Sequence, residues 1–393
     1  MTNPKTKPMT IGVLGGGQLA RMLARAGAHE GHRFRFLDSD PHACAHSDGE
    51  LITGPFEPGP HLDRFADGLD AVTSEFERVP AALVEHLQSL GLIVRPGPAS
   101  LRAAQDRLAE RTLLRELGID TPRFASVETA DDLRAALERV DATEHGAILK
   151  ARVSGYDGKG QAVLEPPAAR DDPTAREHAR AAFDELGGTP AMLDERVRFD
   201  RELSVIAARA ASGAIVSFPL AENRHEHGIL RTTVAPAPDV PPSLERTARD
   251  AAGALMERLD HVGVLALEFF QIGDRLLANE FAPRVHNSGH WSIEGASPSQ
   301  FEAHLACVLG REPAVPTVDR SWAMANIIGE HPAAGVFDAV PGASVHLYGK
   351  PARPGRKLGH VTAPVGAGGC GHDLARQLAS LVADAGMRLT RPG

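Results

Sequence analysis

Apolar and polar positions alternate along this chain with two periods, one typical of strands and one typical of helices. The first residues are polar, and the apolar run Thr10–Leu14 predicts a short buried strand that ends in three glycines. Apolar positions at helical spacing follow over 18–28, and 33–37, 71–73 and 92–94 predict further strands with helical patterns between them. Strands and helices in alternation predict a parallel sheet covered by helices.

The middle of the chain changes to a different pattern. A charged helix is predicted over 106–117, and the turn signals at Gly118 and Pro122 indicate a domain boundary. Strand-like runs at 147–150 and 161–164 flank a glycine-rich segment, which predicts a hairpin with a long mobile tip. Four later runs alternate as half-buried antiparallel strands do, at 201–208, 214–219, 264–271 and 275–280. The centre of the chain is therefore predicted to be mixed α+β.

The charge balance and the cysteines exclude some classes of partner. The 393 residues carry 42 basic and 51 acidic side chains, a formal charge of -9, with no basic stripe for nucleic acid. The apolar runs are far shorter than the roughly 20 residues that a membrane span needs. Three dispersed cysteines and no signal peptide favour a reducing cytoplasm. We expect a multidomain cytoplasmic protein, for which a phosphorylated small molecule is a suitable ligand.

A glycine run follows the first predicted strand. Gly15, Gly16 and Gly17 lead into the predicted helix at Gln18, where free backbone N–H groups and the helix dipole favour a bound anion such as a phosphate. The spacing also matches GxGxxA, and Asp38 lies at the distance expected of a ribose-binding acid, which is typical of nicotinamide dehydrogenases. A glycine turn that serves packing alone is a third interpretation.

A second glycine-rich segment carries two lysines. Lys150 ends a predicted strand and is followed by Gly155-Tyr156-Asp157-Gly158-Lys159-Gly160-Gln161. Glycines let the backbone approach phosphates and let a loop close, and two ammonium groups suit a triphosphate. A plain hairpin turn would need fewer glycines, and the Walker pattern GxxxxGK[ST] does not occur. The segment therefore predicts a nucleotide-binding loop of a different kind.

Two acidic residues interrupt apolar strands in the second half of the chain. Glu268 lies in one predicted strand, and Asn279 and Glu280 lie in the next. A buried carboxylate needs a partner. Two carboxylates and an amide, together with nucleotide phosphates, suit Mg²⁺, which takes few protein ligands. Structural salt bridges are the alternative interpretation.

Polar side chains are dense directly after this segment. A cation, two imidazoles, an amide and a hydroxyl group stand together in Arg284-Val285-His286-Asn287-Ser288-Gly289-His290-Trp291, which predicts substrate recognition. His286 and His290, like His225 and His227, raise the alternative of zinc, but no cysteine or HExxH pattern accompanies them.

The last motif is basic. Four cations fall within 350–357 of the run Tyr348-Gly349-Lys350-Pro351-Ala352-Arg353-Pro354-Gly355-Arg356-Lys357. This predicts a phosphate clamp or, alternatively, a solvated turn. Only six basic residues are lysines, and four of them lie in predicted motifs, at positions 150, 159, 350 and 357. Lysine suits phosphate binding, and chance clustering is the alternative.

Seven segments, taken in order, resemble one family of ATP-grasp enzymes, the N5-carboxyaminoimidazole ribonucleotide synthetases. They lie within residues 11–361 and read IGVLGGGQLARML, EFERVP, GYDGKGQ, DERVRFDREL, ENRHEHGILR, NEFAPRVHNSGHWSIEGA and RPGRKLGH. Related ATP-grasp ligases share the nucleotide segments but not GGGQLARM together with APRVHNSGHWSIEGA. The combination is therefore specific.

The resemblance implies an α/β and α+β architecture, with an ATP-grasp fold, an N-terminal Rossmann-like (pre-ATP-grasp) domain and a small C-terminal β-rich domain. The expected divisions are 1–118 for the Rossmann-like domain, 119–196 for the small ATP-grasp subdomain with the glycine-rich loop, 197–312 for the large subdomain with the metal site, and 313–393 for the β-rich segment packed on the core. A homodimer is expected from the resemblance alone.

The resemblance also implies a reaction. ATP phosphorylates bicarbonate to carboxyphosphate, and the amine of 5-aminoimidazole ribonucleotide is carboxylated, with release of ADP and phosphate, as a step of purine biosynthesis. Carboxyphosphate is labile in water, so a closing loop and a dry, metal-bearing site suit this chemistry. No covalent nucleophile is expected.

Site residues follow from the resemblance, position by position. ATP contacts are expected from Arg107, Lys150, Gly155, Tyr156, Asp157, Gly158, Lys159, Gly160, Gln161, Glu195, Glu202, His225, Asn279 and Glu280. Mg²⁺ is expected at Glu268 and Glu280. The small-molecule substrates are expected at Gly16, Gly17, Gln18, Glu75, Arg284, His286, Asn287, Ser288, Lys350 and Arg356. Catalytic roles are expected for Lys159, Arg284, His286 and Asn287.

Three positions depart from the family pattern. Ser74 stands where an aromatic residue is common, Arg78 where an amide is common, and Ser154 where glycine is common. They concern ribonucleotide packing and loop mobility rather than the class of reaction. The segment after Ala363 carries no motif and is expected to complete a small β domain or an interface.

Three other functions remain as alternatives from the sequence. A formate-dependent glycinamide ribonucleotide transformylase would share the ATP site, and the sequence around 284–291 distinguishes the two. A nicotinamide dehydrogenase would leave GYDGKGQ and the paired glutamates unexplained. A non-catalytic nucleotide sensor would not need the complete set of charged ligands.

Overall fold

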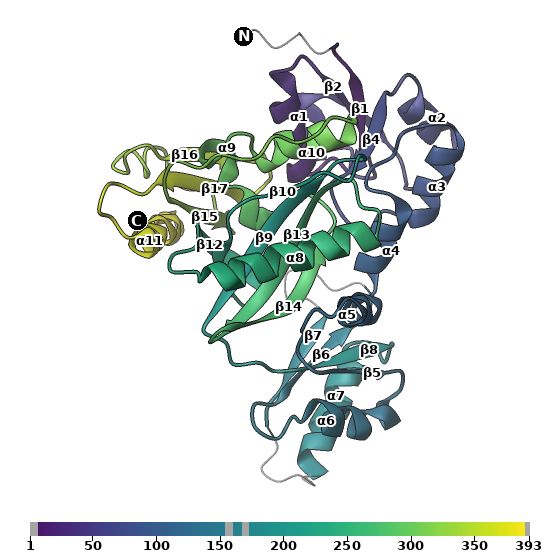
Figure 1. Ribbon diagram of the computed structural model, residues 1–393, viewed down its shortest axis with the longest axis vertical. Helices are drawn as coiled ribbons and strands as arrows, with labels where there is room; N and C mark the ends of the chain where they lie inside the picture. The colour runs from purple at the N-terminus through teal and green to yellow at the C-terminus, as the bar shows by residue number, and fades with distance from the viewer. Residues whose placement is uncertain (1–6, 154–159, 167–172, 390–393) are drawn as a thin grey trace.

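The computed structural model describes residues 7–153, 160–166 and 173–389, which contain three β-sheets. The N-terminal sheet lies at one end of the molecule, a small antiparallel sheet at the other, and a large sheet between them (Figure 1). Positions 154–159, which hold Ser154 and most of the predicted nucleotide loop, lie outside the described residues. No described helix is long and apolar enough to cross a membrane.

The N-terminal sheet is parallel, as predicted, with the strand order β3-β2-β1-β4. Its strands are β1 (Thr10–Leu14), β2 (Arg33–Asp38), β3 (Glu50–Thr53) and β4 (Ala71–Ser74). The helices of this region are α1 (Gln18–Ala28), η1 (Cys44–Asp48), α2 (Pro60–Ala66), α3 (Ala81–Ser89) and α4 (Pro98–Gln105). The predicted strand at 92–94 is wrong, because Val94 forms only one isolated parallel bridge, to Val72.

Helix α5 (Arg107–Glu116) leads from this region into the small antiparallel sheet. It begins one residue after the predicted start, because Asp106 is its cap and accepts from the amides of Leu108 and Ala109 at 2.9 and 3.3 Å. The small sheet has the order β5-β8-β6-β7. Its elements are β5 (Phe124–Val127), η2 (Ala130–Asp132), α6 (Leu133–Val140), β6 (Ala147–Ala151), β7 (Gln161–Leu164), α7 (Pro173–Glu185) and β8 (Ala191–Glu195). The predicted hairpin is confirmed, since Lys150 on β6 pairs with Gln161 on β7.

The large sheet is antiparallel and runs in the order β14-β13-β9-β11-β12-β15-β17-β16, with β10 paired to β9. Its strands are β9 (Arg201–Arg209), β10 (Ile215–Ser217), β11 (Ala221–Glu226), β12 (Ile229–Ala235), β13 (Gly263–Ile272), β14 (Arg275–Ala282), β15 (Trp322–Ile328), β16 (Ser344–Leu347) and β17 (Lys357–Pro364). The helices are α8 (Pro242–Arg258), η3 (Asn287–Gly289), α9 (Ser292–Gly295), α10 (Gln300–Val308) and α11 (Gly371–Leu389). Alternating side chains of its strands fill the core on the face that α8 covers (Figure 1).

The C-terminal strands extend the large sheet directly. Strand β15 pairs with β12, so the β-rich C-terminal segment continues the same sheet. The segment after Ala363, which carried no sequence motif, ends in helix α11, and this helix packs against β15 and β12.

Two buried histidines join the N-terminal region to the large sheet. His304 on α10 lies 2.8 Å from the Thr73 hydroxyl on β4, and its Nδ1 accepts the backbone N–H of Val264 at 3.0 Å. His261 lies between the Ser100 hydroxyl at 3.0 Å and the Val264 carbonyl at 3.1 Å. Because burial disfavours the charged imidazole, the pKa of His261 is lowered to about 4 and the pKa of His304 to about 3.

These two pKa values predict that acid destabilises the fold. Below a pH of about 6.5 the unfolded chain binds protons at both imidazoles while the folded chain does not, so the free energy of unfolding falls as pH falls. At pH 5, about 1.5 units below the unfolded pKa, each histidine should lower the free energy of unfolding by on the order of 2 kcal/mol relative to neutral pH. Urea unfolding at pH 7.5 and pH 5 should show a smaller acid loss in His304→Gln than in the wild type. The exposed His42→Gln is the control, and an unchanged acid loss in His304→Gln would contradict the assignment.

Candidate active site

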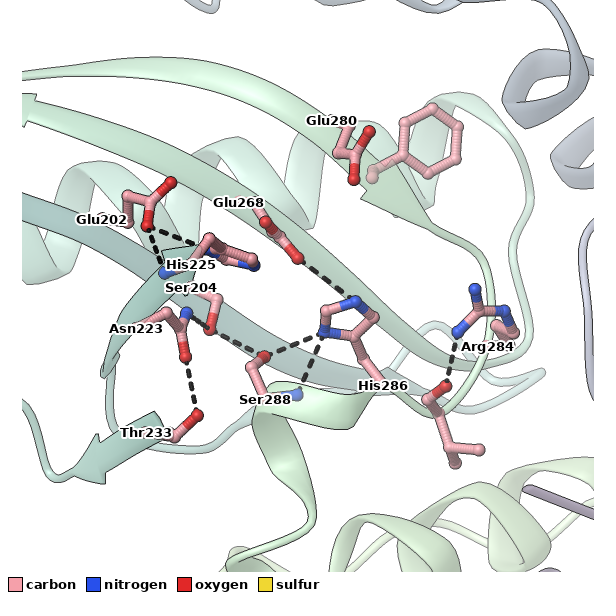
Figure 2. A network of polar contacts seen from close by, with 12 residues as sticks. Glu202, Ser204, Asn223, His225, Thr233, Glu268, Glu280, Arg284, His286 and Ser288 are labelled. Carbon is pink, nitrogen blue, oxygen red and sulfur yellow. Dashed lines mark hydrogen bonds and ion pairs between the residues drawn. The ribbon is translucent and has the colours of Figure 1, made fainter. Parts of the chain in front are cut away.

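Four neighbouring strands of the large sheet each contribute one titratable side chain to a single region (Figure 2). These side chains are Glu280 on β14, Glu268 on β13, Glu202 on β9 and His225 on β11. His225 Nδ1 lies 2.8 Å from a Glu202 oxygen, and Glu268 lies 3.1 Å from His286 Nε2. Glu280 lies 3.4 Å from the guanidinium of Arg107 on α5.

Neighbouring charges and burial shift the pKa values of this region. Burial and the negative charges of Glu280 and Glu202 raise the pKa of Glu268 to about 7, although His225 opposes the shift. Burial alone would lower the pKa of His225, but the hydrogen bond to Glu202 and the charge of Glu268 raise it. A buried carboxylate whose pKa is raised by neighbouring acids in this way is suited to a bound cation.

The donor set fits a cation that takes most of its ligands from a nucleotide. Within the described part of the chain, no three His, Cys, Asp or Glu side chains are grouped so as to hold a metal ion by themselves. Glu268 and Glu280 supply oxygen ligands, which Mg²⁺ prefers together with phosphates. Of the two acids expected to be buried, Glu268 is mostly enclosed, with a side chain 12% exposed, whereas Glu280 lies on an edge strand and is 47% exposed.

A chain of buried polar groups ends at His286 (Figure 2). Thr233 donates to Asn223 at 2.9 Å, Asn223 to Ser204 at 2.9 Å, and Ser204 to Ser288 at 2.8 Å. The Ser288 hydroxyl lies 2.9 Å from His286 Nδ1, which also accepts the Ser288 backbone N–H at 3.3 Å. Because a backbone N–H can only donate, Nδ1 is the unprotonated nitrogen and Nε2 directs its proton toward Glu268. The polar chain therefore fixes the tautomer and orientation of His286.

This polar chain makes Ser204 a useful test position. Ser204→Ala should lower the free energy of unfolding by about 1–2 kcal/mol, since it removes a buried hydrogen-bonding group, and should also lower kcat roughly tenfold because His286 loses its support. The matched control is Ser100→Ala, which removes a buried hydroxyl beside His261. It should lose similar stability with no change in kcat. Equal kcat values for both variants would show that the polar chain does not support His286.

The predicted nucleotide contacts of the small sheet lie on adjacent strands. Lys150 on β6 is buried, and its Nζ lies 2.7 Å from Asp194 Oδ2 on β8. Glu195, the next residue on β8, pairs with the exposed Arg123 at 3.0 Å. Gly160 and Gln161 follow the segment that lies outside the described residues, and Gly160 has a φ of 69°, which favours glycine.

The glycine run before α1 is explained by contacts with carboxylates of the protein and not by the predicted phosphate. The carboxylate of Glu75, at the end of β4, accepts the amides of Gly17, Leu19 and Ala20, and Asp38 accepts the amide of Gly16. A Cβ at Gly17 would lie 2.5 Å from Glu75 Oε1, so glycine is required for this approach. The expectation of free amides for a phosphate is corrected here, because an anion of the protein already occupies the helix start.

Two expected substrate residues far apart in sequence meet beside this carboxylate. Lys350, in the hairpin between β16 and β17, donates to the side-chain oxygen of Gln18 on α1 at 2.6 Å. The Lys350 ammonium also lies 5.8 Å from the ring centroid of Tyr348, whose hydroxyl lies 2.7 Å from His360 Nδ1. Burial lowers the pKa of Lys350, while the negative charge of Glu75 opposes the shift. We call Gln18, Glu75 and Lys350 the acceptor cluster, because all three are among the residues expected to bind the small-molecule substrate that accepts the carboxyl group.

Arg284 lies between the acceptor cluster and the carboxylates of the large sheet. Its guanidinium is 2.7 Å from Glu77 and close enough to Glu75 and Glu280 for electrostatic interaction. Burial would lower the pKa of Arg284, but these acids raise it, so its charge is permanent. Burial and the positive charge of Arg284 lower the pKa of His286 well below its usual value, so this imidazole is neutral.

Two further expected substrate residues complete this region. Asn287 is buried, and neither polar atom of its side chain has a hydrogen-bond partner among the described residues. An unpaired buried amide is costly, which fits a group that awaits a ligand. Arg356 lies in the same hairpin as Lys350, and its guanidinium makes a weak contact with the Pro351 carbonyl at 3.4 Å.

Some residues of the site were not predicted. Asp194 follows three apolar residues in β8 and is itself buried, and this charge in an apolar run is visible in the sequence. Ser204, Asn223 and Thr233 carry no such signal, because short polar residues are common in strands and only the tertiary structure aligns them. Asp38, the acid expected to bind ribose in a dehydrogenase, instead accepts the amides of Gly16 and Asp40.

Fold and site together define an ATP-grasp ligase, with a lysine-bearing antiparallel sheet set beside a large sheet that carries paired carboxylates. Family models agree with this class. The ATP-grasp domain matches residues 112–301, the ribonucleotide synthetase preATP-grasp domain matches 8–105, and the phosphoribosylaminoimidazole carboxylase C-terminal domain matches 323–365.

Known relatives identify the family. The N5-carboxyaminoimidazole ribonucleotide synthase of Pseudomonas aeruginosa is 46% identical over 90% of this chain and 94% of the relative. The structure of the synthetase from Thermus thermophilus is 45% identical, with a TM-score of 0.85 over 95% of this chain and 98% of that chain. An Aspergillus clavatus structure in complex with ADP and 5-aminoimidazole ribonucleotide is 28% identical, with a TM-score of 0.83 over 96% and 99%. This chain belongs to the N5-carboxyaminoimidazole ribonucleotide synthase family, which excludes the dehydrogenase and transformylase interpretations.

Proposed function

We propose that this chain uses ATP and bicarbonate to carboxylate the amine of 5-aminoimidazole ribonucleotide, forming N5-carboxyaminoimidazole ribonucleotide, ADP and phosphate in purine biosynthesis. The observation that carries the proposal is the position of Arg284, whose charge interacts with both Glu75 of the acceptor cluster and Glu280 of the large sheet. A permanent cation between two binding regions suits the transfer of an anionic carboxyl group from one to the other.

The nucleotide is assigned to the region between the small and large sheets. Lys150, Arg107, Glu202 and His225 would contact ATP, with Asn279 and Glu280 beside its phosphates and Glu195 at the end of β8. Glu268 and Glu280 would hold Mg²⁺, which supplies charge neutralisation at the transferring phosphoryl group when bound. The loop Gly155–Gln161, including Lys159, would cover the phosphates and exclude water.

The acceptor is assigned to the other side of Arg284. Lys350 and Arg356 would bind the ribonucleotide phosphate, because the amides of Gly16 and Gly17 are already satisfied by carboxylates. Arg284 and Asn287 would hold the carboxyl group, and the unsatisfied amide of Asn287 supports this role. His286 is neutral, and with Ser288 it forms one wall of the reacting region.

The carboxylation itself needs no covalent bond to the protein. A bicarbonate oxygen attacks the γ-phosphorus of ATP and ADP leaves. The amine nitrogen then attacks the carboxyl carbon, phosphate leaves, and the nitrogen loses a proton. The contribution of the protein is to place charges and exclude water, because carboxyphosphate hydrolyses readily.

The proposal includes Mg²⁺ as the metal, a cytoplasmic location and a homodimer. Three free cysteines, two of them buried, suit a reducing compartment. The homodimer rests on the family resemblance.

The decisive experiment measures ADP release from MgATP and bicarbonate with and without 5-aminoimidazole ribonucleotide. Stimulation by this ribonucleotide is the expected result. A parallel reaction contains glycinamide ribonucleotide and formate, which should not stimulate release. Stimulation only by the formate pair, or no stimulation by either acceptor, would overturn the proposal.

A further inference from the structure

A buried group of three charged side chains lies behind the lysine assigned to the nucleotide. Asp194 Oδ2 on β8 accepts from Lys150 Nζ at 2.7 Å and from a guanidinium nitrogen of Arg111 on α5 at 3.0 Å. The side chains of Arg111 and Asp194 are each 2% exposed, and that of Lys150 is 11% exposed. Water therefore screens their charges weakly.

The balance of charge within this group is positive. The cations Arg111 and Lys150 hold the pKa of Asp194 below its usual value despite burial, so its carboxylate is ionised. One carboxylate and two cations leave a net charge of about +1. Without Arg111, the Lys150 and Asp194 pair would be neutral, and Lys150 would offer much less attraction to a phosphate.

Arg111 also reaches a second sheet. Its Nη1 donates to the Ala278 carbonyl on β14 at 2.6 Å. Its Nη2, which binds Asp194, also lies 3.4 Å from the side-chain oxygen of Asn279. One guanidinium thus binds β8 of the small sheet and β14 of the large sheet. A planar group with several fixed donors can make both contacts, whereas a lysine ammonium is a single point charge.

We propose that Arg111 is a positioning residue of the nucleotide site. It shares Asp194 with Lys150, so that the lysine is held in place without being neutralised, and it fixes that lysine relative to the strand that carries Glu280. The inference rests on the proposed function, in which Lys150 contacts the phosphates of ATP. Neither Arg111 nor Asp194 touches the nucleotide in this scheme.

A charge-swap series tests the proposal through the affinity for ADP, measured by calorimetry, and through the KM for MgATP. Arg111→Met makes the group neutral and should weaken ADP binding and raise the KM for MgATP about tenfold, with the KM for the ribonucleotide unchanged. The double variant Arg111→Met with Asp194→Asn restores a net charge of +1 and should recover most of this loss. Arg111→Lys should fall between Arg111→Met and the wild type, because it keeps the charge but not both contacts.

The matched control is Arg115→Met on the same helix, whose guanidinium donates to the hydroxyl and carbonyl of Thr121 and not to Asp194. It should leave ADP affinity unchanged, and thermal unfolding of every variant checks that the fold is intact. A double variant that binds ADP as weakly as Arg111→Met would overturn the charge argument, as would a normal affinity in Arg111→Met. Because ADP binding needs no acceptor, this result is independent of whether the ribonucleotide stimulates ATP turnover in the wild type.

Discussion

Glu280→Gln is expected to lower ADP release at least about 100-fold and to raise the Mg²⁺ concentration needed for half-maximal rate. The substitution keeps the size of the side chain but removes one of two carboxylates assigned to the metal. Loss of a charged metal ligand should cost several kcal/mol of stabilisation, of which about 2.7 kcal/mol corresponds to 100-fold. The measurement is ADP release in the presence of the ribonucleotide across a Mg²⁺ titration.

The fold should tolerate this change, because the Glu280 side chain is 47% exposed and its recorded ion pair with Arg107 is long, at 3.4 Å. Glu222→Gln is the control, since it makes the same chemical change in the same sheet at a carboxylate that binds Arg201 and His372. Near-normal ADP release in Glu280→Gln, or an equal loss in Glu222→Gln, would remove the basis for the metal assignment.

Lys350→Ala is expected to raise the KM for 5-aminoimidazole ribonucleotide about 30-fold while changing the KM for MgATP less than threefold. The contact assigned to Lys350 is a half-buried, charged donor to a phosphate, and its loss should cost roughly 2 kcal/mol. The Gln18 side chain would also lose its 2.6 Å partner. Initial rates with each substrate varied in turn separate the two KM values.

A suitable control lies in the same hairpin. Arg353 is an exposed cation three residues away, so Arg353→Ala changes the net charge by the same amount without removing a buried contact. It should alter the ribonucleotide KM only slightly. If Lys350→Ala weakened both substrates equally, Lys350 would not be a ligand of the acceptor phosphate.

Much of the fold could be predicted because periodicity is a local property. The strands at β1, β6, β7, β9, β13 and β14 and the helix α1 all carry clear apolar patterns. The strand expected at 92–94 failed because a short apolar run also fits a segment that makes only one bridge. The place of the C-terminal strands in the large sheet depends on the pairing of β15 with β12, which no local pattern specifies.

Some site residues could likewise be predicted from local sequence patterns, whereas others depend on tertiary contacts. Lys150, Glu268 and Lys350 stood out because a charge in an apolar or glycine-rich run needs a reason. The Glu75 carboxylate at the start of α1 was not foreseen in that place, since its approach to Gly17 joins positions 58 residues apart. Arg111 resembled an ordinary surface residue of an amphipathic helix until the structure placed it against Asp194.

The contact between Lys350 and Gln18 joins positions 332 residues apart, and this has a consequence during synthesis on the ribosome. Gln18 is synthesised early, whereas Lys350 is synthesised 332 residues later. A nascent chain could therefore fold its N-terminal and nucleotide-binding portions while still lacking one of the three residues of the acceptor cluster. Under the role proposed for Lys350, the ability to bind the ribonucleotide is gained late in synthesis, so a shorter nascent polypeptide would not withdraw this metabolite from finished enzyme molecules.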